Sequence, residues 1–138
     1  MKTKLVFLVI TFLMFFYYYS ISQNTQNEKF DTFFENFSLN PEFQLSRIKF
    51  PLLSIRYNDE GVLDTTYLKK EKWKHQNFDF RSGWDARGQL YDNFNTGLKD
   101  TDERVFEWRG IGNSIRDQYF FKRIKGKWYL IKNIDYSI

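Results

Sequence analysis

His75 is the only histidine in this chain, and it is the residue best suited to acid–base chemistry. An imidazole changes its charge near neutral pH and can act as a general base when a carboxylate lies within hydrogen-bonding reach. Asp79 and Asp85 follow closely enough in the sequence to supply that carboxylate. One hypothesis is therefore a small cavity enzyme that uses His75 with Asp79 or Asp85 as its acid–base pair. The alternative is a solvated histidine in a loop after a lysine-rich turn.

Other catalytic and metal-binding patterns are not met by the sequence. A zinc site is disfavoured because one histidine and no cysteine leave too few nitrogen and sulfur ligands. The segment 92–103 is rich in oxygen ligands, but Phe94 occupies a position at which a calcium loop needs a ligand. There is no Gly-x-Ser-x-Gly motif and no glycine-rich phosphate loop. We therefore expect no metal and no cofactor, and these absences favour a protein that is not an enzyme.

The strongest structural pattern is a predicted hairpin over residues 117–134, whose two strand-length runs are rich in aromatic, β-branched and basic residues. Gly126 separates the runs and supplies the positive φ that a tight turn or a bulged three-residue turn needs. The two turns imply registers one residue apart, and both remain open. Both place Trp128 and Leu130 on the same face of the hairpin. Because the other face is also apolar, we expect a helix to cover one face and a cavity or a second subunit to cover the other.

A helix is expected before the sheet. Its apolar residues recur at i, i+3, i+4 and i+7, as in an amphipathic helix that lies on a core: Phe30, Phe33, Phe34 and Phe37. Thr25 and Glu28 have the spacing of a capping box at its start, and the helix should end near Leu39. Asn40 then caps a second, short helix whose first residue is Pro41.

Extended segments follow these helices. Residues 47–57 form a predicted strand, which must be an edge strand or bulged at Pro51 because proline cannot donate to a ladder. The later segments are a turn at 58–61, a returning strand at 62–68, an exposed helical turn at 69–74, short strands and loops at 75–99, and a strand at 105–111. Helices first and antiparallel strands after them predict an α+β domain, with N-terminal helices packed on a curved, mostly antiparallel sheet that ends in a long hairpin.

Residues 1–22 have the pattern of a secretory signal peptide, with two lysines, an uncharged apolar stretch, and small residues where a signal peptidase cleaves. An uncleaved anchor is the alternative. We expect cleavage, followed by a single α+β domain over residues 23–138. Because the chain has no cysteine, burial alone must hold this domain together. Two of the 21 basic residues and none of the 17 acidic residues lie in the leader, so the remaining net charge is small.

The basic residues of the hairpin interleave with aromatic ones, a pattern that also occurs in proteins that bind single-stranded nucleic acid. We interpret these lysines instead as residues that keep a sheet edge soluble, and we expect no nucleic acid as partner. Arg47 is interpreted as a cation just past the end of the short helix, paired with Glu35 or Glu42.

A family motif occupies the segment between the first helix and the first strand. In that family, Phe-Gln-x-Ser-Arg-Ile-x-Phe-Pro-Leu follows an aromatic helix, and here the motif consists of Phe43, Gln44, Ser46, Arg47, Ile48, Phe50, Pro51 and Leu52. Over most of residues 28–136 the chain resembles domain-of-unknown-function family number 4348, a family of exported Bacteroidetes proteins. The order of its elements also resembles the nuclear-transport-factor-like (SnoaL-like) cone fold.

This resemblance implies a cone-shaped domain and a periplasmic or extracellular bacterial protein, but it implies no activity. Many members of the family look like lipoproteins, and this chain departs from them because it has no leader cysteine. The motif residues Phe43, Gln44, Arg47, Phe50 and Pro51 are expected to be structural.

The expected function is a non-catalytic module that binds a small ligand, a protein partner or a second copy of itself through aromatic surface. The residues expected to line its cavity are Trp73, His75, Trp108 and Tyr119. No membrane contact is expected after the leader is removed.

Overall fold

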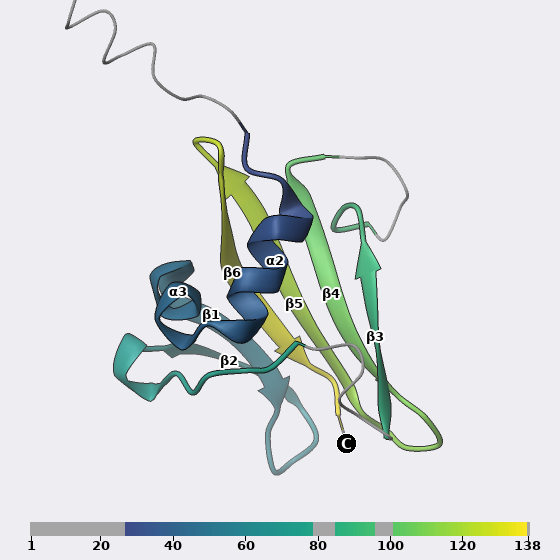
Figure 1. Ribbon diagram of the computed structural model, residues 1–138. Helices are drawn as coiled ribbons and strands as arrows, with labels where there is room; N and C mark the ends of the chain where they lie inside the picture. The colour runs from purple at the N-terminus through teal and green to yellow at the C-terminus, as the bar shows by residue number, and fades with distance from the viewer. Residues whose placement is uncertain (1–26, 79–84, 96–100, 138) are drawn as a thin grey trace, which may run out of the picture.

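The structure is a computed structural model that describes residues 27–78, 85–95 and 101–137 (Figure 1). The helical segments in this part of the chain are α2 (Phe30–Leu39), α3 (Pro41–Ser46) and the 3₁₀ turn η1 (Lys70–Lys72). The strands are β1 (Ile48–Tyr57), β2 (Leu63–Leu68), β3 (Ala86–Tyr91), β4 (Glu103–Gly110), β5 (Arg116–Ile124) and β6 (Lys127–Asp135).

The strands form one curved sheet in the order β2-β1-β6-β5-β4-β3. Neighbouring strands are antiparallel except for β1 and β6, which run parallel. Figure 1 shows α2 lying across one face of this sheet, with α3 beside it. The predicted α+β class, with helices on a curved and mostly antiparallel sheet that ends in a long hairpin, is confirmed.

The β5–β6 hairpin has the tighter of the two registers that the sequence left open. Ile124 pairs with Lys127, so the turn is the two residues Lys125 and Gly126. Their φ angles are 48° and 78°, which is the left-handed geometry of a type I′ hairpin turn. Further along, Phe120 and Phe121 pair with Lys132 and Leu130, which leaves Ile131 as the extra residue of a bulge. The turn thus fixes the register near the tip, and the bulge shifts it farther along.

The hairpin lies in the middle of the sheet, between β1 and β4. The interpretation of its lysines as protection for a sheet edge is therefore wrong. Instead, Lys132 places its Nζ 3.9 Å from the ring centre of Phe120, and Lys122 forms an ion pair with Glu103. Their aliphatic stems cover apolar strand surface while the ammonium groups stay near water.

The core lies between α2 and the sheet. All four phenylalanines of the predicted stripe are buried, as are Trp128 and Leu130, which are 0% exposed. The ring of Phe121 meets the four stripe residues edge-on, with centroid distances of 5.3–5.8 Å. Such tilted and edge-to-face contacts suit the charge distribution of aromatic rings. Because each fully buried phenylalanine contributes roughly 1.5–3 kcal/mol, this cluster is the main stabilising feature of the domain.

Glu28 precedes α2 instead of capping it from within. The N-cap is Lys29, which makes no side-chain capping bond, so the predicted capping box is wrong for Glu28; Thr25 lies outside the described residues. The Glu28 carboxylate accepts two hydrogen bonds from the Arg47 guanidinium, at 2.8 and 3.0 Å, and one from the backbone N–H of Trp128 at 2.8 Å. Arg47 is therefore paired with Glu28, and the expected pairing with Glu35 or Glu42 is wrong.

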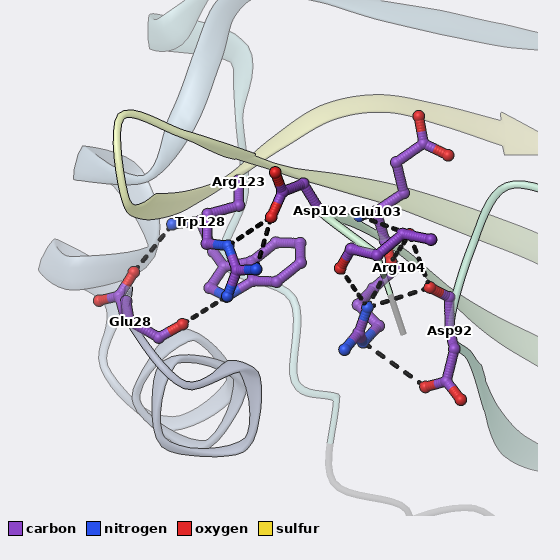
Figure 2. A network of polar contacts seen from close by, with 8 residues as sticks. Glu28, Asp92, Asp102, Glu103, Arg104, Arg123 and Trp128 are labelled. Atoms are coloured by element: carbon purple, nitrogen blue, oxygen red, sulfur yellow. Dashed lines mark hydrogen bonds and ion pairs between the residues drawn. The ribbon is translucent and has the colours of Figure 1, made fainter. Parts of the chain in front are cut away.

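Trp128 joins the start of the described chain to the hairpin (Figure 2). Its indole N–H donates to the backbone oxygen of Glu28 at 2.9 Å. The guanidinium carbons of Arg123 and Arg104 lie 5.1 and 5.2 Å from its ring centre, within the range of cation–π contacts. Asp102 holds Arg123 and Asp92 pairs with Arg104. The sheet and the chain before α2 are thus tied together by charged groups around one buried indole.

The substitution Glu28→Gln tests this connection. It should lower the free energy of unfolding by about 1–3 kcal/mol, because the mostly buried Arg47 loses its counter-charge while the amide still accepts one hydrogen bond. Chemical denaturation followed by tryptophan fluorescence measures the change. The matched control is Glu35→Gln on the exposed face of α2, which should change stability by less than about 0.5 kcal/mol. Equal effects of the two substitutions would contradict the assignment.

Asn40 ends α2 and caps α3, as predicted. Its Oδ1 accepts hydrogen bonds from the N–H groups of Glu42 and Phe43, both at 3.0 Å, and Pro41 occupies the first helical turn. In β1, the pairing with β6 shifts register between Ile48 and Leu53, around Pro51. Of the two alternatives for Pro51, the bulge is therefore confirmed, and β1 is an interior strand.

The sheet face opposite α2 carries a smaller apolar cluster. Its buried members are Val105, Phe120 and Ile134, and partly buried side chains pack around them: Ile55, Tyr91, Phe94, Ile131 and Tyr136. In the ranges that the structure describes, no helix has the length and apolar character needed to cross a bilayer.

Candidate functional site

The helix-side face of the sheet changes from apolar to polar toward the end that lies away from the hairpin tip. Directly paired residues share a face, so the registers define a row of side chains across five strands. This acidic row consists of Asp64 on β2, Arg56 on β1, Asp135 on β6, Asp117 on β5 and Trp108 on β4. Three carboxylates and one guanidinium therefore lie side by side, with an indole at one end.

The neighbouring row connects these polar groups to the core. Asn133 pairs with Tyr119, and Tyr119 pairs with Phe106. The Tyr119 ring meets Phe78 edge-on at 4.7 Å, and Phe106 meets Trp108 at 5.1 Å. The acidic row thus has packed aromatic side chains on its inner side.

Asp117 lies in a buried environment that is unusual for a carboxylate. One carboxylate oxygen, Oδ2, accepts a hydrogen bond from the Tyr119 hydroxyl. The other oxygen, Oδ1, is buried and has no hydrogen-bond partner among the described residues. Burial raises the pKa of Asp117 from 3.8 to about 6, the negative charge of Asp135 adds to the increase, and the Tyr119 hydrogen bond opposes it. Burial and the Asp117 charge also raise the pKa of Tyr119 well above its usual value.

A pocket of about 430 Å³ adjoins the acidic row. It is lined by Arg56, Tyr57, Asn58, Asp59, Asp64, Asp135 and Ser137. Three of these residues are aspartates and one is an arginine, so the pocket carries net negative charge at neutral pH. In the ranges described, no three carboxylate or imidazole groups are close enough together to hold a metal ion. The pocket is therefore better suited to an organic cation or to a ligand with several hydrogen-bond donors.

The structure does not bring His75 and Asp85 together as an acid–base pair. His75 and Asp85 are both exposed, and no hydrogen bond between them is found among the described residues. The backbone oxygen of Asp85 accepts hydrogen bonds from the N–H of Ile111 and from the Asn113 amide, each at 2.8 Å. Asp79 lies outside the described residues. An exposed His75 does not support the cavity-enzyme hypothesis.

Two of the residues expected to line a cavity lie on the same face of the sheet, on neighbouring strands. Trp108 and Tyr119 lie in adjacent rows of the helix-side face, next to Asp117. Trp73 lies elsewhere: its half-buried indole packs on the core and donates from Nε1 to Gln44 at 2.9 Å. Sequence reasoning missed Asp117 and Asp135 as site residues. The available signal was an aspartate at each open end of the predicted hairpin, at the start of its first strand and at the end of its second strand.

The family-motif residues hold the fold around α3. Gln44 is 0% exposed, and its amide makes four hydrogen bonds. Its Nε2 donates to the backbone oxygens of Phe37 and Gln76. Its Oε1 accepts from the Trp73 indole N–H and from the backbone N–H of Gln76. Phe43 and Phe50 are partly buried against the core, and Pro51 lies on the surface at the β1 irregularity. Arg47 also donates to the backbone oxygen of Trp128 at 3.1 Å.

Solved structures with a similar fold come from Bacteroides species. An NTF2-like protein from Bacteroides fragilis has a TM-score of 0.61 and 24% sequence identity, and the match covers 84% of this chain and 50% of that protein. A cystatin-like protein from Bacteroides caccae has a TM-score of 0.58 and 24% identity, covering 82% of this chain and 78% of its own. A Bacteroides uniformis protein has a TM-score of 0.56 and 23% identity, and the match covers 80% of this chain and 78% of that protein.

These similarities concern the fold. This chain spans half the length of the Bacteroides fragilis protein. No curated protein matches the sequence. A family model described only as "-like" matches residues 28–137, which is more than half of the chain. The chain therefore belongs to the family that this model describes, and its fold is the α+β fold of the NTF2-like Bacteroides fragilis protein.

Proposed function

We propose that this protein is an exported, non-catalytic binding module that takes a small ammonium-bearing ligand at the acidic row. The observation that carries the proposal is the buried Asp117 Oδ1, which lacks a donor among the described residues. Its neighbours in the row, Asp135, Arg56 and Asp64, line the acidic pocket. A buried carboxylate oxygen without a partner loses several kcal/mol of hydration, and the positive charge of an ammonium group beside it recovers part of that loss.

The charges along the row favour a cation. Asp64 and Asp135 flank the single guanidinium of Arg56, and Asp117 adds a third carboxylate. Two opposite charges 4 Å apart attract by about 4 kcal/mol at the effective dielectric of a protein surface. The Trp108 indole at the end of the row adds an aromatic face, which also attracts ammonium groups.

The raised pKa gives this ligand class a distinct pH dependence. An ammonium group beside Asp117 favours the ionised carboxylate, so it binds better when the carboxylate has already lost its proton. With a pKa of about 6, affinity should rise about tenfold between pH 5 and pH 7.

The experiment is an NMR titration of the full mature chain with choline and ethanolamine, and with 1,2-propanediol as an uncharged comparison. The two cations should shift amide signals of Asp117, Asp135 and Arg56, and Asp117→Asn should weaken their binding at least fivefold and remove its pH dependence. Asp31→Asn, on the exposed side of α2, is the matched control and should bind as the unmodified chain does. Equal shifts with the diol, or unchanged binding by Asp117→Asn, would contradict the proposal.

Proton transfer is a second candidate function, and one observation favours it. A carboxyl group with a pKa of about 6 beside a buried phenol has the properties of a general acid or base at neutral pH. Such an enzyme would use Asp117 as its base, with Tyr119 as hydrogen-bond donor, and it would not need His75.

Two further parts of the proposal concern export and assembly. Export rests on residues 1–22, with their basic start, apolar stretch and small residues at the cleavage position. A homodimer is supported by the partly exposed apolar cluster on the sheet face opposite α2, which a second copy of the chain would cover. Both stay predictions.

A further inference from the structure

Three arginines stand in line on the sheet face opposite α2. Arg87 on β3 pairs with Arg109 on β4, and Arg109 pairs with Arg116 on β5. We call these three residues the arginine ladder. Like charges directly opposite one another on a sheet repel and destabilise it. Three in succession therefore require a local counter-charge, a ligand, or both.

Glu107 supplies part of that counter-charge from inside the sheet. Its side chain is 0% exposed. Its carboxylate accepts hydrogen bonds from Arg109 Nε at 2.8 Å, from Arg116 Nε at 3.4 Å and from the Gln118 amide, and Arg109 Nη2 also lies 2.8 Å from it. One carboxylate thus holds two guanidinium groups in place, while the ladder keeps a net charge of +2.

The two held arginines still face water. The side chains of Arg109 and Arg116 are 57% and 50% exposed. Arg116 is also stacked on Tyr136, with its guanidinium carbon 5.1 Å from the ring centre. The Nε and Nη2 groups of Arg109 are both directed at the Glu107 carboxylate, and its Nη1 has no hydrogen-bond partner within the described residues. Fixed, exposed guanidinium groups lose little conformational freedom when an anion binds to them.

A pocket opens beside the ladder at the β3 edge of the sheet. Its volume is about 530 Å³, and it is lined by Arg87, Gly88, Gln89, Arg109, Gly110 and Ile111. No carboxylate is among these lining residues. The backbone N–H groups of Gly110 and Ile111 already donate to the backbone oxygens of Ile115 and Asp85. The attraction for a ligand therefore comes from the guanidinium groups of Arg87 and Arg109.

We propose that the arginine ladder and this pocket form a binding site for a tetrahedral oxyanion, the phosphate or sulfate group of a small ester. Planar guanidinium groups donate paired N–H bonds to such oxygens. Arg87 and Arg109, which are directly paired across β3 and β4, can each donate two hydrogen bonds to the same anion. The anion also removes the repulsion along the ladder. The site lies on the opposite sheet face from the acidic row, and it stands independently of the cation proposal.

The test is an NMR titration of the full mature chain at low ionic strength with sodium sulfate and sodium phosphate, against sodium chloride at equal ionic strength. The divalent oxyanions should shift the amide signals of Arg87, Arg109 and Ile111, whereas chloride should not. Glucose 6-phosphate and glucose 6-sulfate then distinguish the two ester classes, because the preferred class binds more tightly.

Arg87→Gln is the first variant, since Arg87 has no contact with Glu107 among the described interactions and its loss leaves the buried carboxylate paired. It should weaken oxyanion binding at least fivefold. Arg109→Gln should weaken it further, and its folding is checked by thermal unfolding. Lys70→Gln removes the same charge from an exposed position on η1 and should change affinity less than twofold. Equal weakening by Arg87→Gln and Lys70→Gln, or equal shifts with chloride, would overturn the proposal.

Discussion

Replacing Gln44 by leucine should lower the free energy of unfolding by about 3–5 kcal/mol. The four hydrogen bonds of its amide would all be lost, and each buried donor or acceptor left without a partner costs about 1–3 kcal/mol. Leucine has a similar volume, so the loss comes from unpaired polar groups and not from a cavity. Because small domains are stable by only about 5–15 kcal/mol, the variant should unfold at markedly lower urea concentration. Urea denaturation followed by tryptophan fluorescence measures this.

The control for this prediction is Gln76→Leu. Gln76 is exposed, and its own amide makes one long hydrogen bond of 3.4 Å, while its backbone groups keep their contacts with position 44. The free energy of unfolding of the Gln76→Leu variant should differ from that of the unmodified chain by less than about 0.5 kcal/mol. If the two glutamine substitutions destabilise the domain equally, the buried amide does not connect α2, α3 and the chain after η1 in the way described.

Replacing Asp117 by asparagine should change how stability depends on pH. The folded pKa of about 6 lies above the unfolded value of 3.8, so between these pH values the folded state binds more protons than the unfolded state. The contribution of Asp117 is therefore most favourable below pH 4 and is lost as pH rises through 6. The loss is about 3 kcal/mol at most, by the free energy that each pKa unit represents.

Asparagine cannot ionise, and its side-chain oxygen can still accept the Tyr119 hydroxyl. The difference in unfolding free energy between Asp117→Asn and the unmodified chain should therefore be small near pH 4 and grow in favour of the variant up to pH 7. Asp31→Asn, at an exposed position, provides the comparison and should show no such trend. A difference that does not vary between pH 4 and pH 7 would contradict the buried environment of Asp117.

The features that the sequence predicted well are those with short-range patterns. The phenylalanine stripe of α2 and the Asn40-Pro41 start of α3 each depend on residues within one or two helical turns. The hairpin was evident from two apolar runs around Gly126, and the burial of Trp128 and Leu130 followed from strand alternation. Local periodicity was sufficient for these elements because it does not depend on which strands become neighbours.

The features that could not be predicted depend on pairs far apart in the chain. The parallel β1–β6 contact places the hairpin in the middle of the sheet, and no local pattern encodes it. Glu28 meets Arg47 and Trp128, the latter 100 residues away in the sequence. The positive φ of Lys125, which selects the turn, is unusual for a residue other than glycine.

The two candidate sites could not be predicted from the sequence for the same reason. The acidic row takes one residue from each of five strands, and the arginine ladder takes one from each of three. In the sequence, Arg87, Arg109 and Arg116 are isolated cations at unremarkable positions. Only the registers of β3, β4 and β5 align them. Trp108 and Tyr119 could be chosen from the sequence as aromatic candidates. Asp117, which lies beside both of them, could be identified only from the structure.

The most direct measurement of the central claim is the titration of the Asp117 carboxyl group by carbon-13 NMR in the full mature chain, alone and with saturating choline. We predict a midpoint near pH 6 without ligand, because the carboxyl group is buried beside Asp135, and a midpoint at least one pH unit lower with choline bound. A midpoint near pH 4 that choline leaves unchanged would contradict both the buried state of Asp117 and the proposed binding of a cation at the acidic row.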